Sequence, residues 1–215
     1  NFIDTANNYG KSEETLGTSK AKNFKIISKL SKIDKNIINV DKYIEKKFSK
    51  TLNRTNRKSI YGYLVHNSED LLSNKGKIII KTLRSLKKRN KVKKIGVSVY
   101  EVNQLKKILT FFKPDIVQIP INILNQNFLK NNFLKKIKKY GIEIHVRSVF
   151  LQGLLLENNA FNFERIVNKK LDIIDKICKK KRITRLNFLL SFINSIKEID
   201  KIVIGIDSCL QLEKI

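Results

Sequence analysis

The sequence predicts an α/β protein built from parallel β-α-β units. Short runs rich in Ile and Val alternate with longer stretches whose apolar residues recur at helical spacing. The short runs are apolar almost throughout, as expected for parallel strands that are covered on both faces. No linker rich in Pro, Gly or Ser divides the 215 residues, so we expect one domain over residues 1–215.

The elements follow one another regularly. Strands are predicted where apolar, β-branched residues cluster: Phe2–Asp4, Lys25–Leu30, Ile60–Val65, Lys94–Val97, Asp115–Ile119, Ile142–Val146 and Ile202–Ile206. Helices are predicted where the apolar period lengthens: Val40–Leu52, Lys75–Arg89, Val102–Phe112, Phe128–Tyr140, Phe163–Lys180 and Arg185–Ile196. In the last helix, Leu186, Leu189, Leu190 and Ile193 share one face.

The glycine pattern decides between the two common α/β folds. A doubly wound nucleotide-binding fold needs G-x-G-x-x-G after its first strand, and no two of the eight glycines have G-x-G spacing. The phosphate-binding loop G-x-x-x-x-G-K-[ST] is also absent. We therefore expect a (β/α)8 TIM barrel. Seven strands are predicted where a barrel needs eight, and the chain contains no Met, so we expect its first strand and helix to be missing.

The composition is strongly basic. The formal net charge is +26, which invites a nucleic-acid-binding interpretation. However, the chain holds 37 Lys, 32 Ile and 23 Asn, a bias that A/T-rich codons explain, and its lysines are spread over most of the predicted helices. We interpret the charge mainly as a solvated surface and expect no specific nucleic-acid partner. No apolar run approaches the ~20 residues of a membrane span.

Cysteine and histidine are scarce. Cys178 and Cys209 lie 31 positions apart and, with only His66 and His145, cannot form a structural zinc set. We expect two reduced thiols and a cytoplasmic protein that needs no metal.

Four titratable residues fall at the C-terminal ends of successive predicted strands, where barrel enzymes place their chemistry. Asp4, Lys29 and His66 end the first three strands, and Tyr9 follows Asp4 in its loop. A phenol is a poor proton donor at neutral pH, and we expect a nearby Lys29 to lower the pKa of Tyr9. Asp4 would hold Lys29, and His66 would orient a carbonyl oxygen. His145 lies inside a strand, and we interpret it as structural.

The motifs around these residues resemble those of the aldo-keto reductases. The similar segments are FIDTANNYGKSEETLG (2–17), IISKL (26–30), GYLVHN (62–67), KKIGVSVY (93–100), DIVQIPINIL (115–124), RSVFLQGLLL (147–156) and IVIGIDSCLQLEKI (202–215). They cover the whole chain in the family's order.

The resemblance implies a (β/α)8 barrel that reduces a carbonyl compound with NADPH, less often NADH. It places Asp4, Tyr9, Lys29 and His66 on the catalytic positions, with Tyr9 as proton donor. It also implies a set of cofactor-binding residues along the later strand ends and the C-terminal segment: Ser98, Gln118, Arg147, Ser148, Phe150, Gly205, Asp207, Ser208 and Gln211.

Three residues depart from the family's usual pattern. Val99 stands where an Asn commonly follows the serine, and Arg147 where a Tyr commonly stacks on the nicotinamide. The planar guanidinium of Arg147 can also stack, and its charge attracts anions. Asp207 stands near the expected 2′-phosphate, which it would repel. NADPH is the first choice, and Asp207 makes NADH a serious alternative.

The substrate class is indicated only weakly. The segment GIEIHVRSVFLQGLLL (141–156) resembles a bacterial branch of the family that is associated with surface polysaccharides and sugars. We therefore expect a small-molecule, sugar-like carbonyl substrate, while the oligomeric state stays open. The alternatives are a non-catalytic or regulatory family member and a basic polyanion-binding protein.

The missing strand has a physical consequence. A barrel of seven strands leaves two unpaired edges. We expect these 215 residues on their own to fold poorly or to bind cofactor weakly, an expectation that full reductase activity would contradict.

Overall fold

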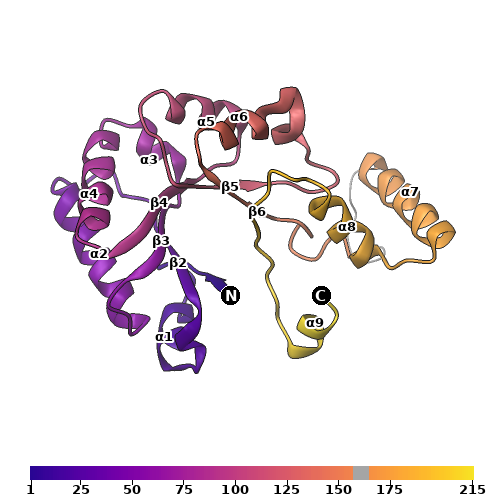
Figure 1. Cartoon of the computed structure of the whole chain (residues 1–215), viewed down its shortest axis with the longest axis horizontal. Helices are drawn as coiled ribbons and strands as arrows, with labels where there is room; N and C mark the ends of the chain where they lie inside the picture. The colour runs from indigo at the N-terminus through magenta and orange to yellow at the C-terminus, as the bar shows by residue number, and fades with distance from the viewer. Residues whose placement is uncertain (157–164) are drawn as a thin grey trace.

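The computed structural model describes residues 1–156 and 165–215. It contains one parallel sheet in the order β1-β2-β3-β4-β5-β6-β7, so every strand pairs with its neighbour in the chain. The strands are β1 (Phe2–Asp4), β2 (Lys25–Leu30), β3 (Ile60–Val65), β4 (Val92–Ser98), β5 (Ile116–Pro120), β6 (Glu143–Arg147) and β7 (Lys201–Ile202). The sheet curls, and most of the helices lie outside the curve (Figure 1). The described strands thus form a partial (β/α)8 barrel of the seven strands that the sequence predicts.

The helices that follow the strands are amphipathic and cover the outer face. The α-helices are α1 (Ser12–Thr18), α2 (Val40–Arg54), α3 (Ser68–Leu72), α4 (Gly76–Lys88), α5 (Val102–Leu109), α6 (Phe133–Lys139), α7 (Arg165–Lys181), α8 (Arg185–Asn194) and α9 (Cys209–Glu213). Two 3-10 turns, η1 (Ala21–Asn23) and η2 (Asn127–Asn132), complete the described elements.

Two apolar clusters lie on the two faces of the sheet. The larger one fills the space between strands and helices, and it includes Ile26 of β2 and Tyr63 of β3. The smaller one joins Ile27, Leu64 and Ile116 inside the curve. Neighbouring residues such as Ile26 and Ile27 belong to different clusters because successive side chains of a strand point to opposite faces. Both faces are therefore buried, as the continuous apolar runs predict.

One predicted helix is broken. The stretch expected as Phe128–Tyr140 consists of η2 and α6, with Asn131 and Asn132 in left-handed backbone at φ 57° and 55°. Asn adopts this conformation more readily than other residues with a side chain, and two in succession interrupt helical hydrogen bonding. The prediction of one continuous helix was wrong here.

Smaller differences concern the ends of elements. β7 is limited to Lys201–Ile202, although the amide of Val203 still donates 2.7 Å to the Val146 carbonyl. The first two residues of the helix predicted as Phe163–Lys180 lie outside the described residues, and its remainder corresponds to α7. The short helices α1, α3 and α9 were not predicted. No described helix has the length and apolar character needed to cross a bilayer.

Candidate active site

A buried ion pair forms the base of the site. Lys29, on β2, is 1% exposed and pairs with the Asp4 carboxylate at the end of the neighbouring strand β1. The Lys29 ammonium also donates 3.1 Å to the Thr5 carbonyl. Burial lowers the pKa of Lys29, and the charge of Asp4 opposes that shift. The two residues are brought together as predicted, and their charges offset each other.

Asp4 has a second partner that the sequence analysis did not assign to it. The side-chain amide of Gln118, on β5, donates 2.9 Å to Asp4 Oδ1. Gln118, predicted to bind the cofactor, therefore also holds the Asp4 carboxylate.

Tyr9 faces this pair from the loop that follows β1. Its ring centroid lies 5.1 Å from Lys29 Nζ, and the side chain is 46% exposed. The loop is fixed because the Tyr9 amide donates 3.1 Å to the Ala6 carbonyl and because the Asn7 side chain accepts 3.0 Å from the Ser31 amide. Tyr9 is thus both anchored and accessible.

The pKa of Tyr9 differs from the sequence-based expectation. Burial and then the negative charge of Asp4 raise it, while Arg147 lowers it less. Lys29 was expected to lower the pKa of Tyr9, but burial of the phenol and the charge of Asp4 shift it in the opposite direction. The phenol therefore stays protonated throughout the neutral range.

His66 completes the predicted group of four. It directly follows β3, its amide donates 3.0 Å to the Leu30 carbonyl, and its ring meets the Tyr9 ring edge-on at 5.8 Å between centroids. Burial lowers the pKa of His66, and the positive charges of Lys29 and Arg147 lower it further. The imidazole is consequently neutral at pH 7 and can donate or accept one hydrogen bond.

Arg147, at the end of β6, borders the same space. Its Nε donates 3.3 Å to Ser98 Oγ, its Nη1 donates 3.3 Å to Ser148 Oγ, and its Nη2 donates 3.3 Å to the Val99 carbonyl. The guanidinium carbon also lies 4.1 Å from the centroid of the Tyr100 ring. Tyr100 was missed by sequence reasoning, although an aromatic residue just after a strand end was the signal available.

The loop after β6 has a strained backbone. Ser148, Leu151 and Gln152 all have positive φ, between 49° and 60°. Buried Asn122 holds the loop in place by donating 3.1 Å to the Ser148 carbonyl. Phe150 is buried against the main core here, so its side chain takes part in packing.

The remaining predicted cofactor residues lie together at the C-terminal end. Ser208 caps the N-terminus of α9 and accepts 3.2 Å from the Gln211 amide, and Gln211 Oε1 accepts 2.8 Å from the Asp207 amide. Gly205, Asp207, Ser208 and Gln211 are all exposed. Within the described residues, none of these four forms a hydrogen bond or ion pair with Asp4, Tyr9, Lys29 or His66. The structure thus separates the buried Asp4–Lys29 pair from an exposed C-terminal segment.

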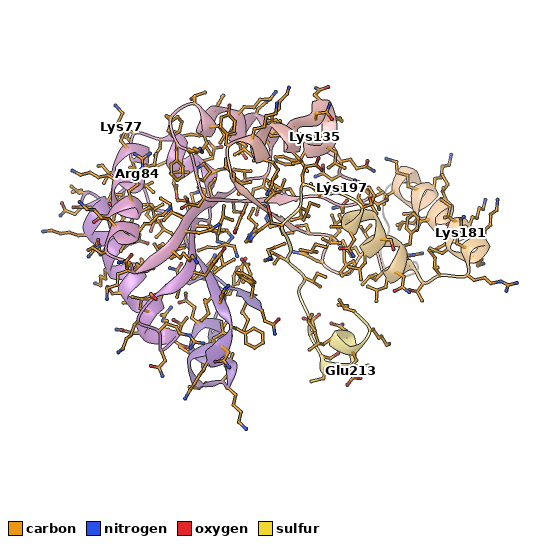
Figure 2. All side chains as sticks on the ribbon, in the orientation of Figure 1. Lys77, Arg84, Lys135, Lys181, Lys197 and Glu213 are labelled. Carbon is orange, nitrogen blue, oxygen red and sulfur yellow. The ribbon has the colours of Figure 1, made fainter. Side chains whose placement is uncertain are left out.

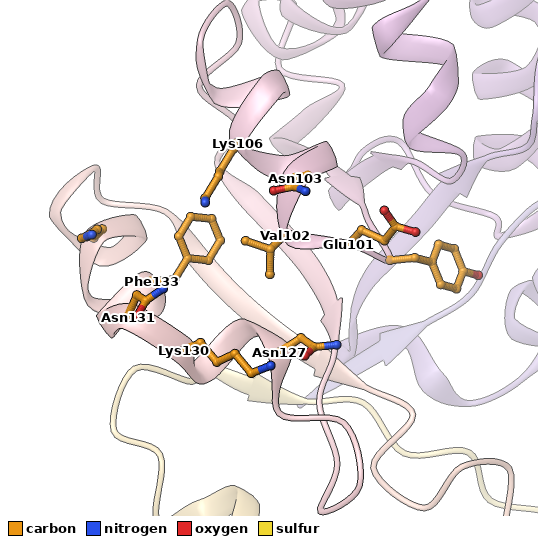
Figure 3. Close-up of a pocket in the computed structure, with 10 residues that line it drawn as sticks. Glu101, Val102, Asn103, Lys106, Asn127, Lys130, Asn131 and Phe133 are labelled. Atoms are coloured by element: carbon orange, nitrogen blue, oxygen red, sulfur yellow. The ribbon is translucent and has the colours of Figure 1, made fainter.

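A basic groove adjoins the site through Tyr100. This groove has a cavity volume of about 540 Å³ and lies between the start of α5 and the η2–α6 segment. Figure 3 shows Lys106 and Lys130 around the ring of Phe133, with Asn103 and Asn127 at the edges. Among the residues that the structure describes, no group of three His, Cys, Asp or Glu side chains is arranged to hold a metal ion.

Comparisons with known proteins place this geometry in a family. The model of the aldo/keto reductase family matches residues 1–215. A search of curated proteins found no match.

Solved structures show the same fold. The holo form of an aldo-keto reductase from Bacillus halodurans has a TM-score of 0.83 at 18% identity, over 100% of this chain and 75% of that one. The glycerol dehydrogenase of Gluconobacter oxydans has a TM-score of 0.72 at 18% identity, over 100% of this chain and 79% of that one. An aldo/keto reductase from Klebsiella pneumoniae has a TM-score of 0.70 at 15% identity, over 99% of this chain and 78% of that one. With the family model matching every residue, the chain belongs to the aldo/keto reductase family.

Proposed function

We propose that this protein reduces an aldehyde or ketone to an alcohol, with Tyr9 as the proton donor. Family membership supports an oxidoreductase that acts on small carbonyl compounds. The single observation that carries the proposal is the convergence of Asp4, Lys29, Tyr9 and His66. They come from three successive strands and one loop.

Each of these residues has a role that follows from its surroundings. Tyr9 is protonated and accessible, so it can transfer its proton to the oxygen of a bound carbonyl. Neutral His66 lies beside it and can donate a hydrogen bond to the same oxygen. Lys29, fixed by Asp4, lies 5.1 Å from the centroid of the Tyr9 ring and can hold that ring in position for the transfer.

The residues present fit a nicotinamide cofactor at the reacting end. The Ser98 hydroxyl and the Gln118 amide offer donors and acceptors that suit a carboxamide, and they lie next to Arg147 and Asp4 respectively. When bound, the nicotinamide would supply the hydride. One structural neighbour, the Klebsiella pneumoniae enzyme, is in complex with NADP and acetate, which supports this cofactor class.

Replacing the phenol tests the proposal directly. Tyr9→Phe should lower turnover of a neutral aldehyde at least 100-fold while leaving nicotinamide cofactor binding, measured by fluorescence titration, within about threefold. The control is Tyr140→Phe, which makes the same change at an exposed site on the outer surface. Turnover by Tyr9→Phe above a tenth of the original rate would contradict the assignment of Tyr9 as donor.

The choice between NADPH and NADH depends on Asp207. A carboxylate repels a 2′-phosphate and accepts a hydrogen bond from a free 2′-hydroxyl, so NADH is the alternative to NADPH. Asp207→Arg should raise the preference for NADPH over NADH about tenfold. Glu213→Arg makes the same charge change at the last residue of α9 and should leave the preference for NADPH over NADH unchanged. If Asp207→Arg left the preference for NADPH over NADH unaltered, Asp207 would not take part in cofactor binding.

The polyanion-binding alternative has less support. Figure 2 shows basic side chains at separated places on the outside of the molecule, such as Lys77, Lys135 and Lys181. Binding proteins for nucleic acid gather such residues on one face. A cytoplasmic protein that acts on a sugar-like carbonyl compound agrees with the motifs, and the Tyr9→Phe test separates it from a regulatory relative or a polyanion binder.

A further inference from the structure

We propose that Arg147 binds an anionic group of the substrate, so that the enzyme prefers carbonyl compounds that carry a carboxylate or a phosphate. This inference rests on the proposed function and specifies its substrate class. It starts from the positive charge of Arg147, which lies beside the proposed reacting group and forms no ion pair among the described residues.

The charges of the site do not cancel. Asp4 offsets Lys29 through their ion pair. Tyr9 is protonated and His66 is neutral, because burial shifts the pKa of each in that direction. Arg147 makes no ion pair with any described carboxylate. The site therefore carries an excess of one positive charge.

The contacts of Arg147 are weak for a guanidinium. Its hydrogen-bond partners, Ser98 Oγ, Ser148 Oγ, the Val99 carbonyl and the Tyr100 phenol, are all neutral. The bonds to Ser98, Ser148 and Val99 are each 3.3 Å long, beyond the usual range for a nitrogen donor. Burial also lowers the pKa of Arg147, which shows that this environment disfavours its charge. An anionic oxygen would form shorter bonds and supply the missing charge.

The position of Arg147 indicates that this anion belongs to the substrate. Its charge affects the pKa values of Tyr9, Lys29 and His66, so it lies close to the reacting group. The exposed segment expected around the adenosine forms no hydrogen bond or ion pair with Arg147 among the described residues. A phosphate of the cofactor is the other anion that Arg147 could bind. Kinetics of Arg147 variants with anionic and neutral aldehydes distinguish these two sources.

Neighbouring side chains add to the positive electrostatic potential around Arg147. The ring of Tyr100 stacks on the Arg147 guanidinium and also lines the basic groove. Lys106, Lys130 and Lys136 line that groove with Glu101 as its one acid among the lining residues (Figure 3). Positive potential of this extent increases the rate at which anionic substrates arrive.

Matched aldehydes test the proposal. The first pair is 4-carboxybenzaldehyde and its neutral methyl ester, and the second is glyceraldehyde 3-phosphate and glyceraldehyde. We expect kcat/KM to be at least tenfold higher for the anionic member of one or both pairs. The pair that shows the preference tells whether the group is a carboxylate or a phosphate.

Variants assign the preference to Arg147. In Arg147→Gln, the ratio of kcat/KM for the anionic aldehyde to kcat/KM for the neutral one should fall to about one, mainly because KM for the anionic aldehyde rises. Arg147→Lys should restore part of this preference. Arg84→Gln removes the same charge from the exposed side of α4 and should keep the original ratio. A ratio of one in the unaltered protein, or an unchanged ratio in Arg147→Gln, would overturn the proposal. A rise in cofactor KM that is equal for both aldehydes would instead assign Arg147 to the cofactor.

A binding measurement separates this inference from the proposed function. Calorimetric titration with terephthalate should show binding to the unaltered protein and at least a tenfold loss of affinity in Arg147→Gln. If neither member of either pair is reduced, the proposed function fails, and terephthalate binding still decides whether Arg147 forms an anion site. Equal binding by both proteins would reject that site.

Discussion

Gln118 donates a 2.9 Å hydrogen bond from its side-chain amide to Asp4 Oδ1, which joins residues 114 positions apart in the chain. The other oxygen of Asp4 pairs with Lys29. The carboxylate is therefore held from both sides, by a charge on β2 and by a neutral amide on β5. This arrangement fixes the base of the site before any ligand binds.

Removal of Lys29 should destabilise the fold. Lys29→Met leaves the Asp4 carboxylate, only 13% exposed, with Gln118 as its remaining side-chain partner. We expect the free energy of unfolding to fall by about 3 kcal/mol, because an unpaired buried charge costs far more than an exposed one. Urea unfolding followed by circular dichroism measures the change.

Two controls show whether charge burial is the cause. The double variant Asp4→Asn/Lys29→Met should recover at least half of the loss, since no charge then remains. Lys138→Met breaks the more exposed pair with Asp200 and should cost about 1 kcal/mol or less. A double variant as unstable as Lys29→Met would mean that lost packing, not the unpaired carboxylate, causes the effect.

The alkaline side of the pH–rate profile reports the state of Tyr9. Burial and the charge of Asp4 raise the pKa of Tyr9 above its ordinary value of about 10. Proton donation needs the protonated phenol, so kcat/KM for reduction should stay level up to about pH 9 and fall only above about pH 10. Steady-state rates with a neutral aldehyde at constant ionic strength measure this. A decline centred near pH 8 would show that Lys29 lowers the pKa after all.

The topology and the meeting of Asp4, Lys29 and His66 at one rim were predictable because both follow from strand ends. Continuous apolar runs marked β2 and β3, and a parallel sheet in chain order brings Asp4, Lys29 and His66 to one rim whatever their side chains do. Short α1 was missed because tertiary contacts hold it, such as the 2.6 Å hydrogen bond from Ser28 to buried Glu13.

The finer features of the site depend on side-chain conformation. The bond from Gln118 to Asp4 crosses the inside of the sheet, and the contact of Arg147 with Tyr100 joins the end of β6 to the segment after β4. Periodicity and strand order carry no information on either contact. The same holds for the pKa of Tyr9, whose direction depends on how deeply the phenol is buried and on the nearby charges of Asp4 and Arg147.

Stability should decrease in mild acid because of His145. It is fully buried in β6, with Nε2 3.3 Å from Glu143 Oε2, and burial lowers its pKa below 6.5 although Glu143 opposes the shift. The unfolded chain therefore binds a proton at higher pH than the folded chain does. As the pH falls below about 6.5, the free energy of unfolding should decrease, by at most about 1.4 kcal/mol per pH unit for this group.

Urea unfolding between pH 7 and pH 5.5 measures this dependence. The pKa of His66 is lowered in the same direction, so both histidines contribute to the slope. His145→Gln should remove the part due to His145, and His145→Gln/His66→Gln should leave little dependence in this window. If the slope in His145→Gln equalled that of the unaltered protein, His145 would have no role in it.

A methyl group at Gly96 should disrupt the sheet. Gly96, on β4, pairs in register with Leu64 and Ile116, and a Cβ there would lie 2.1 Å from the Ile116 carbonyl oxygen and 2.7 Å from Leu64 Cδ2. The neighbouring backbone would have to move, so Gly96→Ala should lower the free energy of unfolding by about 3 kcal/mol. Gly205→Ala meets no atom within 4 Å and should change it by no more than about 0.5 kcal/mol. Equal urea midpoints for the two variants would show that β4 can shift to accommodate the methyl group.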